Sequence, residues 1–158
     1  MTNPTPSTAD APLSRTLPGT WRLVSRIDVD GAGARRPEPM LGEAPVALLI
    51  YDRAGQFAAQ FMARERGGVP AGPSPAGAAS ANNTQAHGGY DAYFGKYAVD
   101  DAAGLVTQTL EGALTPGNVG AVLERAMTVS GDELVIRLAT TAADGTPVTR
   151  TLTWTRVG

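Results

Sequence analysis

Three side chains of this sequence, an acid, a phenol and the single imidazole, are candidates for acid–base chemistry. Glu111 follows an apolar, Thr-rich stretch, and a carboxylate among apolar groups can have a raised pKa and act as an acid or a base. Tyr93 offers a phenol, and His87 is the only histidine of the chain; the unperturbed pKa of an imidazole is about 6.5. We therefore treat Glu111, Tyr93 and His87 as candidate catalytic residues for proton transfer.

The same inventory argues against metal and phosphate chemistry. With no cysteine and one histidine, the chain lacks the His and Cys ligands of a typical zinc site. The pairs Gly67-Gly68 and Gly88-Gly89 lack the strand-to-helix context and the lysine of a phosphate-binding loop. We expect no metal and no other cofactor.

Glu111 and Arg125 occupy neighbouring predicted strands on either side of a turn near residue 117. Counted outward from that turn, the two side chains could face each other. If both pointed into the protein, they would form a buried pair able to orient a polar ligand group. If both pointed outward, they would form an exposed cross-strand pair of little energetic value. The sequence leaves both interpretations open.

The elements that position these groups are short strands, because apolar residues recur with a period of two. The pattern is clearest over 19–29, where one face would carry Trp21, Leu23, Ser25, Ile27 and Val29. Similar segments separated by turn residues cover 45–51, 56–62, 90–99, 105–114, 121–129, 133–140 and 148–156.

Eight strands joined mostly by short hairpins predict an all-β fold. An open meander of this kind would expose two long edges, whereas closure into an up-and-down antiparallel barrel removes them. We therefore predict an eight-stranded lipocalin-like barrel, with a jelly-roll sandwich as the alternative. The interior of such a barrel is either filled by side chains or holds one small ligand.

The chain is predicted to be a single barrel domain over 15–158, preceded by a flexible polar tail over 1–14. Residues 63–89 form a long Gly/Pro-rich connection that would lie across the mouth of the barrel. If the barrel is hollow, the candidate walls of the ligand site are Leu23, Ile27, Tyr51, Phe57, Phe61, Tyr93, Tyr97, Gln108, Arg125 and Met127.

An ordered series of segments resembles the bacterial and fungal lipocalin-like domain family over about residues 15–157. The matching segments are 17–25 (LPGTWRLVS), 49–51 (LIY), 55–57 (GQF), 93–97 (YFGKY), 116–120 and 152–157 (LTWTRV). The resemblance implies a small barrel in which Trp21 plugs the closed end beneath Arg156. It also implies that cofactor-free cyclases or isomerases of hydrophobic intermediates exist among similar barrels.

Net charge and composition exclude some classes of binding partner. The net charge of −2 and the absence of a basic stripe argue against nucleic acid and against an acidic membrane surface. The first residues lack the apolar run of a signal peptide, so we expect a cytoplasmic location, and a homodimer stays open. Three functions remain: binding of a small hydrophobic ligand inside the barrel, cofactor-free isomerisation or cyclisation of a hydrophobic substrate, and a filled barrel that acts through its surface.

Overall fold

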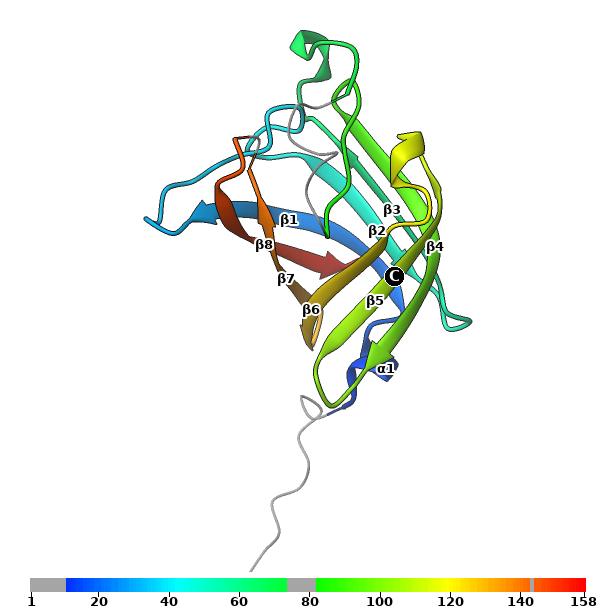
Figure 1. The fold of residues 1–158 in the computed structure, drawn as a ribbon. Helices are drawn as coiled ribbons and strands as arrows, with labels where there is room; N and C mark the ends of the chain where they lie inside the picture. Colours follow the sequence, from blue (N-terminus) through cyan, green and yellow to red (C-terminus); the bar gives the residue numbers. More distant parts are fainter. Residues whose placement is uncertain (1–10, 74–81, 143) are drawn as a thin grey trace, which may run out of the picture.

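In the computed structural model, which describes residues 11–73, 82–142 and 144–158, the chain forms a closed antiparallel barrel (Figure 1). Its strands within these residues are β1 (Gly19–Asp30), β2 (Val46–Tyr51), β3 (Gln56–Met62), β4 (Tyr90–Asp100), β5 (Leu105–Ala113), β6 (Val122–Ser130), β7 (Glu133–Thr141) and β8 (Pro147–Arg156). Each strand pairs with the next, and β8 pairs back onto β1. The predicted up-and-down barrel is confirmed, and the jelly-roll alternative is wrong.

The two ends of the barrel differ in their connections. The short turns 52–55, 101–104 and 131–132 lie at one end, together with helix α1 (Leu13–Thr16) (Figure 1). We call this the closed end. The longer connections lie at the opposite, open end, and they include η2 (Arg66–Gly68) and η3 (Pro116–Asn118). The described parts of the predicted mouth loop, 63–73 and 82–89, are at this open end, and 74–81 lie outside the described residues.

The closed end is sealed by Trp21, whose ring lies beneath Arg156. The guanidinium carbon of Arg156 is 4.2 Å from the centroid of the indole, and its Nη1 donates to the Pro18 carbonyl at 3.0 Å. Gly19 permits this approach, because a Cβ at that position would lie 2.5 Å from Arg156 Nη1. The Gly19-Thr20-Trp21 motif therefore serves packing at this end of the barrel.

Helix α1 packs against the same end. Leu13 and Leu17 are buried, and the backbone N–H and hydroxyl of Ser14 both donate to the Asp101 carboxylate, at 2.8 and 2.7 Å. Leu13 and Ser14 thus belong to the folded domain, although the sequence placed them in a tail. Among the described residues, no helix has the length and apolar character needed to cross a membrane.

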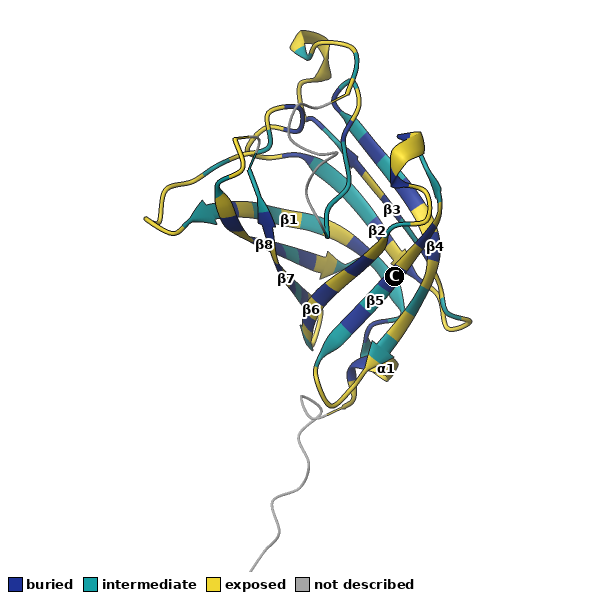
Figure 2. Cartoon of the chain, in the orientation of Figure 1, coloured by how far each residue is buried: buried dark blue, intermediate teal, exposed yellow. Residues whose placement is uncertain are grey.

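Apolar side chains fill most of the barrel interior, and buried and exposed residues alternate along the strands (Figure 2). The largest fully buried side chains are Trp21, Trp154, Tyr51, Leu17, Leu110, Leu123, Leu134 and Val106. Aromatic rings meet edge to face within this core, as at Phe61 and Trp154, whose centroids are 5.7 Å apart.

A β-bulge in β1 changes which of its side chains face inward. Leu23 pairs with Trp154 and Ser25 with Thr153, so Val24 has no partner and is 64% exposed. The alternation changes phase at this residue. The predicted inward position of Ile27 is wrong, because Ile27 lies 36% exposed beyond the bulge. Arg26 and Asp28 take the inward positions instead.

A second bulge, between β4 and β5, leaves Glu111 without a paired residue on β4. Phe94 pairs with Gly112 and Gly95 with Leu110, so the backbones approach closely here. A Cβ at Gly95 would overlap the carbonyl oxygen of Thr109. Because that oxygen belongs to the backbone of the paired strand, it cannot move aside cheaply.

We predict that Gly95→Ala destabilises the barrel by about 3 kcal/mol or prevents folding, because it overpacks a paired backbone. Gly117→Ala is the control: its Cβ would meet no atom within 4 Å, so the loss should stay below about 1 kcal/mol. Urea unfolding followed by circular dichroism measures both. Equal stability of the two variants would contradict the close approach at Gly95.

Candidate functional site

The open end of the barrel contains a cavity of about 40 Å³ that is lined by charged side chains. We call it the charged cavity. Its ionisable lining residues are Arg26, Glu38, Asp91, Tyr93, Arg125 and Arg150, and its apolar walls include Leu41, Phe61, Leu138 and Leu152. The hollow that the sequence led us to expect as apolar therefore carries three guanidinium groups.

Ordinary strand alternation positions most of these groups. Asp91 is two residues before the inward Tyr93 on β4, and Arg150 is two residues before the inward Leu152 on β8. Arg125 lies between the buried Leu123 and Met127 on β6. Arg26 alone depends on the bulge in β1.

Arg150 and Asp28 form a buried ion pair at the rim of the cavity. Arg150 Nε donates to Asp28 Oδ1 at 3.0 Å, and Arg150 Nη2 donates to Oδ2 at 3.1 Å. Each side chain is less than a tenth exposed. The remaining Nη1 of Arg150 donates to the amide oxygen of Asn83 at 2.9 Å, so this guanidinium is well satisfied.

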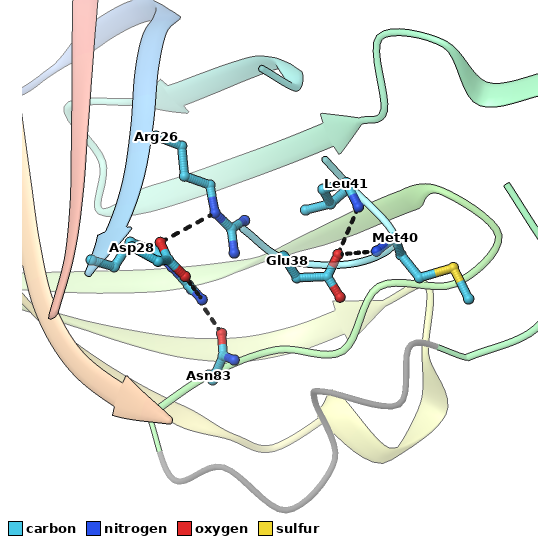
Figure 3. A network of polar contacts seen from close by, with 7 residues as sticks. Arg26, Asp28, Glu38, Met40, Leu41 and Asn83 are labelled. Atoms are coloured by element: carbon cyan, nitrogen blue, oxygen red, sulfur yellow. Dashed lines mark hydrogen bonds and ion pairs between the residues drawn. The ribbon is translucent and has the colours of Figure 1, made fainter. Parts of the chain in front are cut away.

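Arg26 has unused hydrogen-bond donors. Its side chain is 8% exposed, and its one ion pair joins Nε to Asp28 Oδ1 at 3.7 Å (Figure 3). Its guanidinium donates no hydrogen bond to any residue that the structure describes. Burial, reinforced by Arg150, lowers the pKa of Arg26 to about 10, so it stays charged at neutral pH. A buried guanidinium with free donors beside a cavity is suited to bind an oxyanion.

Arg125 contacts the segment that follows the undescribed residues 74–81. Its Nη1 donates to the amide oxygen of Asn82 at 2.7 Å and to the Glu124 carbonyl at 3.0 Å. Burial lowers the pKa of Arg125 to about 10. Asn82 and Asn83 thus place two neutral amide oxygens against two arginines of the barrel.

Asp91 is the unsatisfied acceptor of the cavity. It is 4% exposed, and its Oδ2 accepts a hydrogen bond from the Thr84 hydroxyl at 2.6 Å. Its Oδ1 is buried and accepts none from the residues that the structure describes. Burial raises the pKa of Asp91 to about 6, although the Thr84 hydrogen bond and Arg26 oppose the rise. Both protonation states are therefore accessible near neutral pH.

A wider groove of about 270 Å³ adjoins the charged cavity. The two share the lining residues Glu38, Asn83 and Arg150. Glu38 Oε2 accepts the backbone N–H groups of Met40 and Leu41, both at 2.6 Å, which holds the connection between β1 and β2 at this end (Figure 3). Pro37, Pro39 and Ala142 add apolar surface to this outer groove.

The predicted catalytic residues separate in the structure. Tyr93 lines the charged cavity, and burial raises its pKa. His87 is exposed at the open end. Glu111 is on the outside of the barrel, with its side chain 45% exposed and 3.7 Å from Lys96 Nζ. Both pairings of Glu111 with Arg125 that the sequence left open, the inward and the exposed one, are wrong, because Arg125 lies opposite Val106.

The predicted wall residues also separate. Phe61, Tyr93 and Arg125 line the charged cavity. Tyr51, Phe57, Gln108 and Met127 are buried in the filled part of the barrel. Leu23 is partly buried against the core, Ile27 is exposed, and the hydroxyl of the part-buried Tyr97 donates to the Asp52 carbonyl.

Sequence reasoning missed Arg26, Asp28, Asp91 and Arg150. A signal existed for two of them, because Asp91 and Arg150 share the period-two face of residues that were expected to be buried. No signal revealed the bulge that turns Arg26 and Asp28 inward. Within the described residues, no group of three or more His, Asp or Glu side chains converges as a metal site would require.

We predict that Asp28→Asn lowers the free energy of unfolding by about 3–5 kcal/mol, because it leaves buried arginines without their counter-charge. The matched change Glu111→Gln removes a carboxylate from an exposed pair and should cost at most about 1 kcal/mol. Urea unfolding at neutral pH measures both losses. Similar losses would contradict the buried pairing of Asp28.

Asp91 should make the barrel less stable as the pH rises. Its pKa is about 6 in the folded chain against an ordinary value of 3.8, so the folded state binds the proton more tightly. Stability that is present at low pH is then lost as the pH rises through about 6, by about 3 kcal/mol in all. Asp91→Asn should remove this loss and exceed the wild type in stability at neutral pH. Urea unfolding across the pH series tests this, and parallel curves for the two proteins would contradict it.

The chain matches one protein family over nearly its whole barrel. The family model described as a lipocalin-like domain matches residues 18–157, which confirms the resemblance noted in the sequence. Among solved structures, the complex of bovine odorant-binding protein with a selenium-containing odorant is 15% identical, with a TM-score of 0.46. That match covers 98% of this chain and 78% of the other. No curated protein sequence matches significantly. Because the family match spans the whole barrel, the chain belongs to the lipocalin-like domain family.

Proposed function

We propose that the protein binds a small amphipathic molecule at the open end of the barrel, with an anionic oxygen group in the charged cavity and an apolar body in the outer groove. Arg26 is the observation that carries the proposal. It is a guanidinium more than nine-tenths buried, which lines a cavity and donates no hydrogen bond to the described residues. Burying such a group with unused donors is costly, and a ligand oxyanion would accept hydrogen bonds from the donors that the long contact with Asp28 leaves unused.

The charge balance supports an anion. Three arginines line the charged cavity, and Asp28 and Glu38 contribute two carboxylates close by. Asp91 carries little negative charge below its pKa of about 6. Below that pH one positive charge is in excess, and above it the three arginines and three carboxylates balance. Charge-assisted hydrogen bonds from the arginines to an oxyanion, about twice as strong as neutral ones, are available in both cases.

The asparagine contacts support the proposal, because Arg125 and Arg150 already donate hydrogen bonds to oxygen atoms in this geometry. The amide oxygens of Asn82 and Asn83 are 2.7 and 2.9 Å from Arg125 and Arg150. A ligand carboxylate that replaced either amide would exchange a neutral acceptor for a charged one. Arg26 would bind the same group without displacing any protein contact.

The volumes indicate how such a ligand divides between the two spaces. The charged cavity, at about 40 Å³, takes only the polar end of a ligand. The outer groove, at about 270 Å³, is close to the lower limit of about 300 Å³ for small-molecule sites. The ligand is therefore small and partly apolar, in keeping with the family's barrel, but not wholly hydrophobic.

We predict that the protein discriminates between two dyes that differ by one anionic group. The sulfonate 8-anilino-1-naphthalenesulfonate should bind more tightly than the neutral N-phenyl-1-naphthylamine. In Arg26→Met the sulfonate should lose about tenfold or more in affinity, the equivalent of one charge-assisted hydrogen bond of about 1.5–3 kcal/mol. The affinity of the neutral dye should not change. Fluorescence titration measures all four dissociation constants.

Arg137→Met is the control, because Arg137 is exposed on β7 and lines neither space. It should leave the affinities of both dyes unchanged. An equal loss of affinity for the sulfonate dye in Arg26→Met and Arg137→Met would show that the dye binds by general surface charge. Failure of both dyes to bind would favour a filled barrel that acts through its surface.

A further inference from the structure

We propose that Asp91 is a catalytic acid–base residue and that the charged cavity isomerises its ligand by moving a proton on a carbon next to a carbonyl group. This inference rests on the proposed function, because the substrate is the anionic ligand described above. It adds an activity that requires no cofactor or second reactant.

The geometry pairs an unused acceptor with unused donors. Asp91 Oδ1 is buried and accepts no hydrogen bond, while the guanidinium of Arg26 donates none to the described residues. Both residues line the same cavity, and they do not form an ion pair with each other. A bound group placed between them would meet a proton acceptor at one side and a cationic donor at the other, which is the arrangement that proton abstraction next to a carbonyl requires.

The step balances within the site. Asp91 Oδ1, as a carboxylate, takes the proton from the carbon. The electron pair of the broken C–H bond forms a C=C bond, and the carbonyl π pair moves to the oxygen as an enolate. Arg26 stabilises this oxygen. Asp91 then returns the proton. Return to the original carbon restores the carbonyl compound, whereas return to the atom at the opposite end of the enolate system shifts a double bond.

Thr84 is a positioning residue for this step. Its hydroxyl donates to Asp91 Oδ2 at 2.6 Å, which leaves Oδ1 as the oxygen that meets the ligand. This hydrogen bond also opposes the rise in the pKa of Asp91. Loss of the hydroxyl should therefore raise that pKa further.

Several charged or titratable groups surround Asp91. Five of them lie on strands: Arg26 and Asp28 on β1, Tyr93 on β4, Arg125 on β6 and Arg150 on β8. Glu38 lies in the connection after β1. Burial, the largest effect, and Glu38 favour the protonated form of Asp91, whereas Arg26 favours the carboxylate form. Of these groups, Asp91 has its pKa raised to about 6, so a rate that rises through that pH would report Asp91.

Phenylpyruvate is a suitable probe, because it combines a carboxylate, a ketone with acidic CH2 protons and an apolar ring. Exchange of its CH2 protons for deuterium in D₂O, followed by proton NMR, reports proton abstraction directly. The wild type should accelerate the exchange, and Asp91→Asn should slow the catalysed rate by about a hundredfold or more, in line with the usual contribution of a general base. The catalysed rate in the wild type should rise with pH through about 6.

Three further proteins make the result specific. Glu111→Gln removes a carboxylate outside the barrel and should exchange at the wild-type rate. Thr84→Val should move the midpoint of the pH profile upward, which loss of packing alone would not do. Asp91→Asn should still bind phenylpyruvate in a calorimetric titration and still unfold cooperatively, so that its slow exchange reports lost chemistry.

The outcomes separate this inference from the proposed function. If phenylpyruvate binds to the wild type through Arg26 but exchanges at the uncatalysed rate, the catalytic role of Asp91 is overturned and the binding function stands. Exchange by Asp91→Asn at the wild-type rate would also overturn the catalytic role of Asp91. If neither phenylpyruvate nor the sulfonate dye binds, the anionic ligand is refuted and the catalytic inference is refuted with it.

Discussion

The β-bulge at Val24 is the feature on which the character of the open end depends. Without it, the alternation set by Trp21 would continue along β1, and Ile27 would face inward. With it, Arg26 and Asp28 face inward and meet Arg150 on the neighbouring strand. Bulges are common where a sheet must redirect a side chain next to a functional site. One unpaired residue thus adds Arg26 and Asp28 to the three charged groups, Asp91, Arg125 and Arg150, that ordinary alternation turns inward.

Charges in a barrel are costly, and this barrel compensates for them only in part. Removing an ion from water costs several kcal/mol even after the protein relaxes. Asp28 offsets part of that cost for Arg150 by accepting three hydrogen bonds from its guanidinium. Arg26 receives one long contact, and Asp91 has one oxygen without a partner. The filled core beneath, with both tryptophans fully buried, supplies the stability that lets these groups remain unsatisfied.

The fold was predictable because its signals are local. Period-two alternation and turn residues identify each strand from a few neighbouring residues, and closure follows from the need to cover sheet edges. The site was less predictable because it depends on register. Leu23 and Val24 are both apolar, so nothing in the pattern shows which of them is skipped. Glu111 could have faced Arg125 only across a tight turn near residue 117, but the connection includes η3 and pairing stops at Thr109 and Val122.

Asp91 and Arg150 illustrate a different limit of sequence reasoning. Both lie two residues before a residue that faces inward, Asp91 before Tyr93 and Arg150 before Leu152, yet a charged residue in an alternating strand is ordinarily assigned to solvent. That assignment holds when each inward position must be apolar for the fold to be stable. It fails at a few positions near an open end, because side chains at the strand ends around a barrel mouth are not needed to fill the core. Charged side chains can therefore occupy those inward positions. Charged residues that interrupt an otherwise apolar inward face, close to the longer connections, are therefore the positions at which a small barrel of this kind is best searched for its site.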